Sequence, residues 1–206
     1  SGYQAVIVPE NKKKMEDAWG CQIAEGKIGL TVTKLINVLA DEPGKVKCVY
    51  IMGENPMISD PDLHHVEKAM KNVEFMVVQD IFLTETAQYA NVVLPAACYA
   101  EKDGTQTNTE RRVQKWRKAQ DPPGEAKADW QIFCELAKHM GFEKQFPYKS
   151  AEEVFTEISK VTPSYAGMDY ARLEKPEALH WPCPTKEHPG TPILHKEKFT
   201  HPDGLG

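Results

Sequence analysis

Polar residues that could bind a ligand follow two short apolar stretches of this sequence. The stretch VYIM leads into Gly53, Glu54 and Asn55, and the stretch FMVV leads into Gln79 and Asp80. Carboxylate and carboxamide groups match the donors and acceptors of a heterocycle, and a carboxylate accepts paired N–H groups well. Glu54 or Asp80 could therefore face the N1–H and the exocyclic amine of a guanine, while Gly53, which has no Cβ, would let a ligand approach the backbone. The structural alternative is that Asn55 and Asp80 only cap the helices that follow them.

A third polar segment, DGTQTNTERRVQ, spans residues 103–114 and contains Asn108, Arg111 and Arg112. Paired arginines suit phosphate or pyrophosphate oxygens, because their guanidinium forks make bidentate hydrogen bonds. The alternative is an exposed basic turn whose arginines pair with Glu110.

The elements around these residues predict a parallel sheet. Apolar residues at helical spacing indicate helices over 31–42 and 61–73, and a short polar helix is expected at 84–89. A continuously apolar stretch at 47–52 indicates a strand buried on both faces, and short apolar stretches at 74–80 and 90–95 indicate two further strands. Strand, helix, strand, short helix, strand is the order of a parallel sheet with crossover connections. In such sheets ligands bind beyond the carboxyl ends of the strands, which is where the polar residues lie.

The rest of the chain divides into helices and an irregular segment. Helices are predicted over 129–140, with Asp129 as N-cap, and over 150–161, where Ser150 and Glu153 have capping-box spacing. From Thr162 the sequence is rich in Pro, Gly and His and has no sustained period. We therefore expect an α/β domain over residues 1–161, with a three-layer, Rossmann-like parallel sheet, followed by an extended C-terminal strap over 162–206.

The composition excludes several classes of function. The formal net charge is −5 and 41% of residues are hydrophobic, which gives no electrostatic footprint for nucleic acid or an anionic membrane. No apolar run reaches the ~18 residues that a membrane span needs. The five cysteines are scattered and form no Cys-x-x-Cys pair, which indicates reduced thiols in a cytoplasmic protein and no zinc site. The sequence contains no nicotinamide-type Gly-x-Gly-x-x-Gly, no P-loop and no Gly-x-Ser-x-Gly elbow.

Four long motifs of this sequence resemble the catalytic α subunit of formate dehydrogenases, which are molybdopterin oxidoreductases. The motifs are YIMGENPMISDPD, VVQDIFLTETAQYANVVLPAACYAEKDGTQTNTERRVQ, PPGEAKADWQIFCELA and WPCP with HPGTPILH, and the likeness runs almost from end to end. It implies a large enzyme with a bis(molybdopterin guanine dinucleotide) cofactor on molybdenum or tungsten and a [4Fe–4S] cluster. The full-length enzyme would oxidise formate to CO2 in a two-electron reaction and pass the electrons on.

The resemblance also implies which residues contact the cofactor. An α/β domain of the family takes the guanosine end of one dinucleotide. The implied cofactor-binding residues are Gly53, Glu54, Asn55, Gln79, Asp80, Thr84, Glu85, Asn108, Arg111 and Arg112.

Several parts of the family pattern have no counterpart here. The cluster cysteines, the cysteine or selenocysteine that ligates the metal, and the substrate arginine are not found. The chain thus resembles an internal fragment that carries the later stretch of a discontinuous domain, so the sheet is expected to be incomplete and the fragment inactive alone. Its implied partners are the rest of the catalytic subunit and electron-transfer subunits, with formate as substrate. Two alternatives stay open: another substrate within the family, as in nitrate reductase or formylmethanofuran dehydrogenase, and a non-catalytic α/β interaction module.

Overall fold

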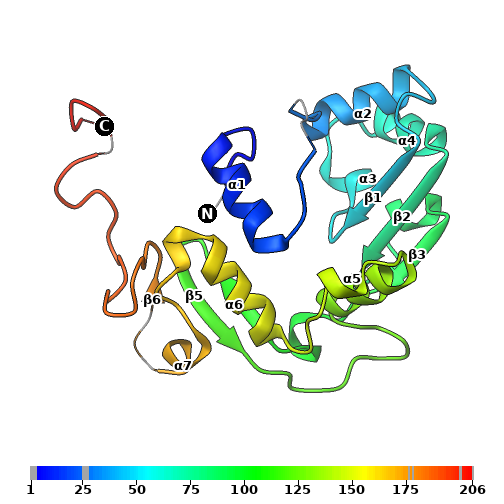
Figure 1. Cartoon of the computed structure of the whole chain (residues 1–206). Coiled ribbons are helices and arrows are strands. Elements are labelled where there is room, and N and C mark those ends of the chain that lie inside the picture. Colours follow the sequence, from blue (N-terminus) through cyan, green and yellow to red (C-terminus); the bar gives the residue numbers. More distant parts are fainter. Residues whose placement is uncertain (1–3, 25–27, 176, 178, 200, 206) are drawn as a thin grey trace. The chain divides into compact units, whose positions relative to one another are not determined.

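The structure is a computed structural model of the chain, and it describes residues 4–24, 28–175, 177, 179–199 and 201–205. Its α-helices and 3-10 helices (η), together with its strands, follow the chain as shown in Figure 1. They are α1 (Pro9–Trp19), α2 (Val32–Asp41), β1 (Cys48–Met52), α3 (Pro56–Ser59), α4 (Leu63–Asn72), β2 (Phe75–Asp80), η1 (Thr86–Tyr89), β3 (Val92–Pro95), η2 (Tyr99–Glu101), β4 (Gly104–Thr107), β5 (Arg112–Trp116), α5 (Asp129–His139), η3 (Glu143–Gln145), α6 (Ala151–Val161), η4 (Pro163–Tyr165), α7 (Tyr170–Leu173) and β6 (Leu179–His180).

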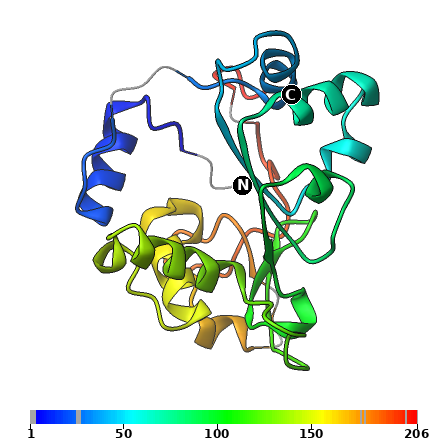
Figure 2. The same cartoon turned by 90° about the vertical axis from the view of Figure 1, so that its right-hand side faces the viewer.

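These elements form two compact units that alternate along the sequence. Unit 1 comprises residues 1–24, 103–117 and 144–206, and unit 2 comprises residues 25–102 and 118–143. The colours of Figure 2 show unit 1 drawn from the blue, green and yellow-to-red parts of the chain. The expected boundary after residue 161 does not coincide with this division, because the hairpin of β4 and β5 clusters with the C-terminal part of the chain.

Unit 2 holds the predicted parallel sheet, in the order β1-β2-β3. Cys48 lies opposite Phe75 in the first strand pair, and Val77 lies opposite Val92 in the second. Both pairs are parallel because each connection crosses over through a helix. The predicted α/β class with a parallel three-stranded sheet is confirmed.

Helices lie on both faces of β1 and β2, whereas most residues of β3 are exposed. On one face, α2 and α4 contribute the apolar stripes that the sequence predicted, and these pack with β1 and β2 into a core. Its most buried members include Leu39, Ala40, Val66, Ala69, Met70, Met76 and Val78. On the other face lies α5, whose Phe133 stacks on Tyr50 of β1 with 5.8 Å between ring centroids. Successive strand residues point to opposite faces of a sheet, so Tyr50 packs against α5 while its neighbour Ile51 belongs to the core formed with α2 and α4.

Local signals fix the ends of several helices. Asp62 accepts a hydrogen bond from the His65 N–H at 3.3 Å and caps α4, and Ser150 caps α6 by accepting from the Glu153 N–H at 3.2 Å. Asp129, which the sequence predicted as the N-cap of α5, is instead the first residue of the helix, and the N-cap is Ala128. Beyond α5, Gly141 has a φ of +82°, the left-handed conformation that ends helices.

Unit 1 contains a small antiparallel sheet in the order β4-β5-β6, with α1, α6 and α7. Its core joins β5 and α6 to the C-terminal segment, and its members are Val113, Phe155, Tyr165, Met168, Tyr170, Leu179 and Cys183. The segment after Thr162 carries only the short elements η4, α7 and β6. Its strand β6 pairs with β5 in the core of unit 1.

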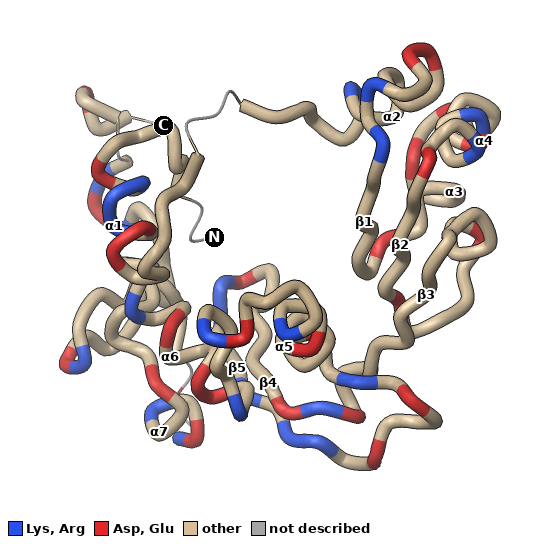
Figure 3. The backbone as a smooth tube through the Cα atoms, turned by 45° about the vertical axis from the view of Figure 1, so that its right-hand side comes forward, with Lys and Arg blue, Asp and Glu red and all other residues tan. Residues whose placement is uncertain are grey.

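Charges of both signs are interspersed along the chain, as Figure 3 shows. No helix in the described part of the chain has the length and apolar character to cross a membrane.

Candidate functional site

The carboxyl ends of β1 and β2 present the predicted polar residues at one edge of the parallel sheet. Gly53 begins the loop after β1 with a φ of +65°, and its N–H donates to the Gln79 carbonyl at 2.9 Å. A Cβ at Gly53 would meet no atom within 4 Å. The glycine is therefore required by its left-handed backbone, which turns the chain away from the sheet.

Asn55 joins the β1 loop to the turn that precedes β3. Its Nδ2 donates to Glu85 Oε2 at 2.7 Å, and its Oδ1 accepts from both the N–H and the hydroxyl of Thr86, at 3.2 and 2.7 Å. The buried Thr86 hydroxyl in turn accepts from the Met57 N–H at 3.1 Å. The carboxamide of Asn55 is thus occupied by protein groups, and it acts as a brace between two loops.

Thr84 and Glu85 shape the same turn. The Thr84 hydroxyl accepts from the Ala87 N–H at 3.2 Å. Glu85 is exposed, and the hydrogen bond from Asn55, followed by one from its own backbone, holds the pKa of its carboxyl below the ordinary value. Glu85 therefore stays ionised at the open end of the sheet.

Gln79 is fully buried and points into the protein. Its Oε1 accepts from the Tyr50 hydroxyl at 2.5 Å, and its Nε2 donates to Asp129 Oδ1 at 2.7 Å. The second oxygen of Asp129 pairs with Lys102. Burial, and then the charge of Asp129, raise the pKa of Tyr50. These side chains form a hydrogen-bonded chain that links β1, β2 and α5 beneath the strand ends.

Glu54 and Asp80 keep acceptor oxygens at the open edge. Asp80 is half-buried, and its Oδ1 accepts from the Phe82 N–H at 3.1 Å. Among the described residues, no hydrogen bond or ion pair engages Asp80 Oδ2 or the exposed Glu54 carboxylate. The two carboxylates follow adjacent parallel strands, so they are suited to accept paired N–H groups of a ligand. Within the described residues, no group of three or more His, Cys, Asp and Glu side chains could hold a metal ion.

The other predicted residues lie in the β4–β5 turn of unit 1, where protein groups engage them. Arg111 has a φ of +69°, and its terminal nitrogens donate to the carbonyls of Trp181, Thr191 (2.8 Å) and Pro192 (2.9 Å). Arg112 forms an ion pair with Glu110 at 2.8 Å. This pairing was the alternative to phosphate binding that the sequence left open.

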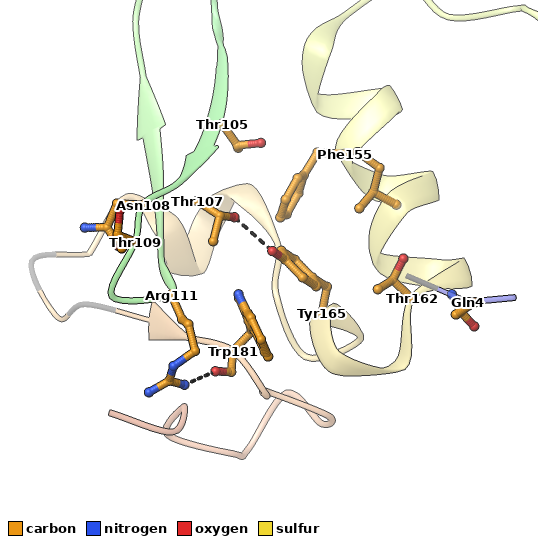
Figure 4. A pocket seen from close by; sticks show the side chains of 11 residues that line it. Gln4, Thr105, Thr107, Asn108, Thr109, Arg111, Phe155, Thr162, Tyr165 and Trp181 are labelled. Carbon is orange, nitrogen blue, oxygen red and sulfur yellow. Dashed lines mark hydrogen bonds between the residues drawn. The ribbon is translucent and has the colours of Figure 1, made fainter. Parts of the chain in front are cut away.

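Asn108 closes the same turn by accepting from the Arg112 N–H at 2.9 Å. A hollow of about 720 Å³ lies beside this turn (Figure 4). Its wall is neutral except for Arg111, and the Thr107 hydroxyl and the Tyr165 hydroxyl bond across it at 2.8 Å. The lining residues are Gln4, Thr105, Thr107, Asn108, Thr109, Arg111, Phe155, Ile158, Thr162, Tyr165 and Trp181.

Unit 2 therefore assembles Gly53, Glu54, Asn55, Gln79, Asp80, Thr84 and Glu85, while Asn108, Arg111 and Arg112 belong to unit 1. Tyr50 and Lys102 were not predicted as site residues, and Asp129 was predicted only as a helix cap. Nothing in the spacing of these residues reveals that they meet beneath the strand ends. The apolar loop after Asp80 was not predicted as part of the site either, although three large apolar residues between two polar stretches are visible in the sequence.

Comparison with known proteins places this geometry in a wider context. The family described as molybdopterin oxidoreductase matches residues 10–139. The alpha subunit of F420-dependent formate dehydrogenase 1 from Methanococcus maripaludis is 58% identical over 205 residues, covering 100% of this chain and 29% of that protein. The assimilatory nitrate reductase catalytic subunit of Bacillus subtilis is 39% identical over 207 residues, covering 98% of this chain and 29% of that protein.

Among solved structures, acetylene hydratase from Pelobacter acetylenicus resembles the chain with a TM-score of 0.58 and 26% identity. That match covers 80% of this chain and 23% of the hydratase. The chain thus spans less than a third of the length of the relatives named here.

Proposed function

The chain belongs to the molybdopterin oxidoreductase family, and we propose that it is part of the catalytic subunit of a formate dehydrogenase. In this proposal unit 2 binds the guanosine end of a molybdopterin guanine dinucleotide at the carboxyl ends of β1 and β2. The cofactor is a bis(molybdopterin guanine dinucleotide) with molybdenum or tungsten, which supplies the two-electron chemistry. Other parts of the full-length protein hold the metal ligand and a [4Fe–4S] cluster.

The observation that carries the proposal is the pair of carboxylates with open oxygens. A guanine presents two adjacent donors, its N1–H and its exocyclic amine, and a carboxylate accepts both in a bidentate arrangement. Asp80 is prepared for this role, because the Phe82 N–H holds one oxygen at 3.1 Å and fixes the plane of the group. Glu54 follows the neighbouring strand and is free to bind a second donor of the same nucleoside.

The remaining residues of the edge orient these carboxylates. Asn55 braces the loop that carries Glu54 and keeps Glu85 ionised through its hydrogen bond at 2.7 Å. Gln79 holds the end of β2 from beneath and leaves Asp80 facing outward. The chemical task of this part of the enzyme is to hold the cofactor in place.

Formate is the proposed substrate of the full-length protein. The formate dehydrogenase alpha subunit from Methanococcus maripaludis is 58% identical to this chain, whereas the nitrate reductase catalytic subunit is 39% identical. Because that relative is an alpha subunit, further subunits are expected, and we propose that they carry the electrons away from the catalytic subunit. In the full-length protein, we expect formate-dependent reduction of an electron acceptor and no nitrate reduction.

Calorimetric titration of the 206-residue chain with GDP tests the binding role directly, with ATP and NAD as competitors of different base and charge. We expect selective GDP binding that Asp80→Asn and Glu54→Gln each weaken by about tenfold to a hundredfold, the loss of a charged hydrogen-bond partner. Glu125→Gln is the matched control, because Glu125 is an exposed carboxylate of unit 2 outside the strand ends. Preference for NAD, or GDP binding that ignores both substitutions, would contradict the proposal.

A further inference from the structure

The loop that follows Asp80 exposes three large apolar side chains in succession. Ile81 is 49% exposed, Phe82 is 72% exposed and Leu83 is 74% exposed. Exposed apolar groups are common when they occur singly, but a contiguous set at a polar edge marks a binding surface. Here the set lies at the carboxyl end of β2 and directly follows Asp80.

Hydrogen bonds fix this loop at both ends. The Phe82 N–H donates to Asp80 Oδ1 at 3.1 Å, and the Phe82 carbonyl accepts from the Thr84 N–H at 3.0 Å. The Thr84 hydroxyl then accepts from the Ala87 N–H in η1, and Asn55 holds Thr86 in the same turn. These bonds hold the backbone of Phe82 next to Asp80.

We propose that Phe82 is the stacking platform for the base whose polar edge Asp80 binds, and that the base is a guanine. This inference rests on the proposed function and adds the residue that recognises the face of the ring. A carboxylate bonds to the edge of a base and leaves its flat faces in water, so tight binding needs an apolar surface next to the carboxylate. The 3.1 Å bond from the Phe82 N–H to Asp80 Oδ1 holds the backbone of Phe82 next to that carboxylate, and the Phe82 side chain is 72% exposed and open to a ligand.

Two interactions with Phe82 would favour binding of a base. Stacking of a base on an aromatic side chain contributes about 1–3 kcal/mol, as measured by alanine substitution. Covering Phe82 also removes from water a ring that is exposed in the structure, together with part of its apolar neighbours Ile81 and Leu83. Edge recognition by Asp80 selects the base, and stacking on Phe82 supplies affinity that depends little on which base is bound.

The experiment compares GDP binding by the wild-type chain with that of Phe82→Ala, Phe82→Tyr and Phe75→Ala. Phe75 is the matched control, because it is an aromatic residue of β2 that is 45% exposed and begins the strand that Asp80 ends. For Phe82→Ala we expect a dissociation constant tenfold to hundredfold larger than that of the wild type, corresponding to roughly 1–3 kcal/mol. Phe82→Tyr and Phe75→Ala should bind GDP nearly as the wild type does. In NMR spectra, the Phe82 ring protons should shift upfield when GDP binds and show contacts to the guanine H8.

The outcomes separate this inference from the proposed function. Selective GDP binding that Asp80→Asn weakens and Phe82→Ala does not would overturn the stacking role and leave the guanosine site standing. The loop would then cover another part of the full-length protein. An equal loss of binding in Phe82→Ala and Phe75→Ala would also overturn it, because the effect would not be local. If the wild-type chain binds no GDP, the proposed function fails and the inference fails with it.

Discussion

Glu54 and Asp80 differ from their polar neighbours in where their oxygens can act. The side chains of Asn55, Thr84 and Gln79 form hydrogen bonds with other protein groups. A carboxamide that already has partners gains little from a ligand, because binding would exchange one hydrogen bond for another. The two carboxylates keep acceptor capacity, so the specificity that we propose for the strand ends resides in them.

The hydrogen bond between Asn55 and Glu85 can be tested through the pKa of Glu85. Asn55→Asp keeps an oxygen that can accept from Thr86, but it cannot donate to Glu85 and adds a nearby negative charge. We expect the pKa of Glu85 to rise, because its lowered value depends first on the Asn55 donor. Carbon-13 NMR titration of the side-chain carboxyl measures it.

Glu67 provides the internal control for that titration. Its pKa is also lowered, but by hydrogen bonds from Lys71 and Tyr89, so it should not change in Asn55→Asp. The sign for stability follows from the direction of the shift. Because its pKa is lowered in the folded state, Glu85 stabilises the fold at pH values above the ordinary pKa of a glutamate. This stabilisation is lost as the pH falls through the folded-state pKa. An unchanged Glu85 titration would show that the bond does not persist in solution.

Residue types allowed part of the site to be predicted, and their contacts decided the rest. Glu54 and Asp80 were recognisable because they follow apolar strands, and the structure places both at the sheet edge with open oxygens. Arg111 was equally recognisable as a phosphate-binding type, yet its guanidinium holds three backbone carbonyls of residues 181–192. Those acceptors lie about 70 to 80 positions away in the chain, and no local pattern encodes such a meeting.

At the scale of elements, periodicity predicted the helices and strands that have a strong apolar pattern. The stripes of α2, α4 and α6 and the continuous strands β1 and β2 were all found close to their expected bounds. The hairpin of β4 and β5 was missed, because its sequence is polar and its pattern is that of a surface turn. The helix α1 was missed too, since its lysine-rich sequence buries only Met15. Both elements depend on tertiary contacts more than on their own pattern.

The hydrogen-bonded chain of Tyr50, Gln79 and Asp129 ties three elements together, and its removal should be costly. Tyr50→Phe deletes the donor to the buried Gln79 Oε1 and leaves that acceptor without a partner, at a cost of about 1–3 kcal/mol. In the double variant with Gln79→Leu the penalty should be less than the sum of the single effects, because both variants break the same bond. Urea unfolding followed by NMR signals of β2 measures these values within unit 2.

Tyr89→Phe is the matched control for that cycle. Tyr89 donates to Glu67 at 3.0 Å, but Glu67 lies at the surface, where water can replace the lost partner. Tyr89→Phe should therefore lower the free energy of unfolding by less than Tyr50→Phe does. The raised pKa of Tyr50 adds a pH signature. The stability that Tyr50 contributes is fully present at pH values below the ordinary tyrosine pKa of about 10, and it is lost as the pH rises through the folded-state pKa. The free energy of unfolding that Tyr50→Phe removes should therefore be smaller at high pH than at neutral pH. Equal losses in the two variants would contradict the role of the buried chain.

At the scale of the whole molecule, the C-terminal segment is integral to unit 1. Arg172 of α7 donates to the carbonyls of Gly167 (2.5 Å), Thr185 (3.3 Å) and His188 (2.7 Å). Gly167 is enclosed so closely that a Cβ would lie 1.9 Å from the Thr185 carbonyl oxygen. Together with Arg111, these contacts fix residues 181–192 against the hairpin and α7 by bonds to the backbone. Composition alone, rich in Pro and Gly, indicated only an irregular segment.

The parallel sheet of unit 2 leaves β1 paired on one side only. Among the described residues β1 pairs with β2 alone, whereas the outer side of β3 meets Lys127 next to Pro95 through a short bridge. An unpaired strand edge offers backbone donors and acceptors to another chain. We therefore expect the 206-residue chain to self-associate through β1, so that its mass by light scattering rises with concentration under reducing conditions. Reduction matters because Cys48 of β1 is an exposed thiol.

Lysine substitutions distinguish edge pairing from general apolar contact. Met52→Lys places a charge at the end of β1, where the residue is 48% exposed, and a charged edge opposes pairing with a second strand. Met140→Lys, at a position 63% exposed just beyond α5, removes the same type of apolar side chain away from the edge. The mass of Met52→Lys should stay that of a monomer, while Met140→Lys should associate as the wild type does. A wild-type chain that stays monomeric at high concentration would show that the edge of β1 is protected. If both lysine substitutions reduce association equally, the association depends on exposed apolar surface instead of strand pairing.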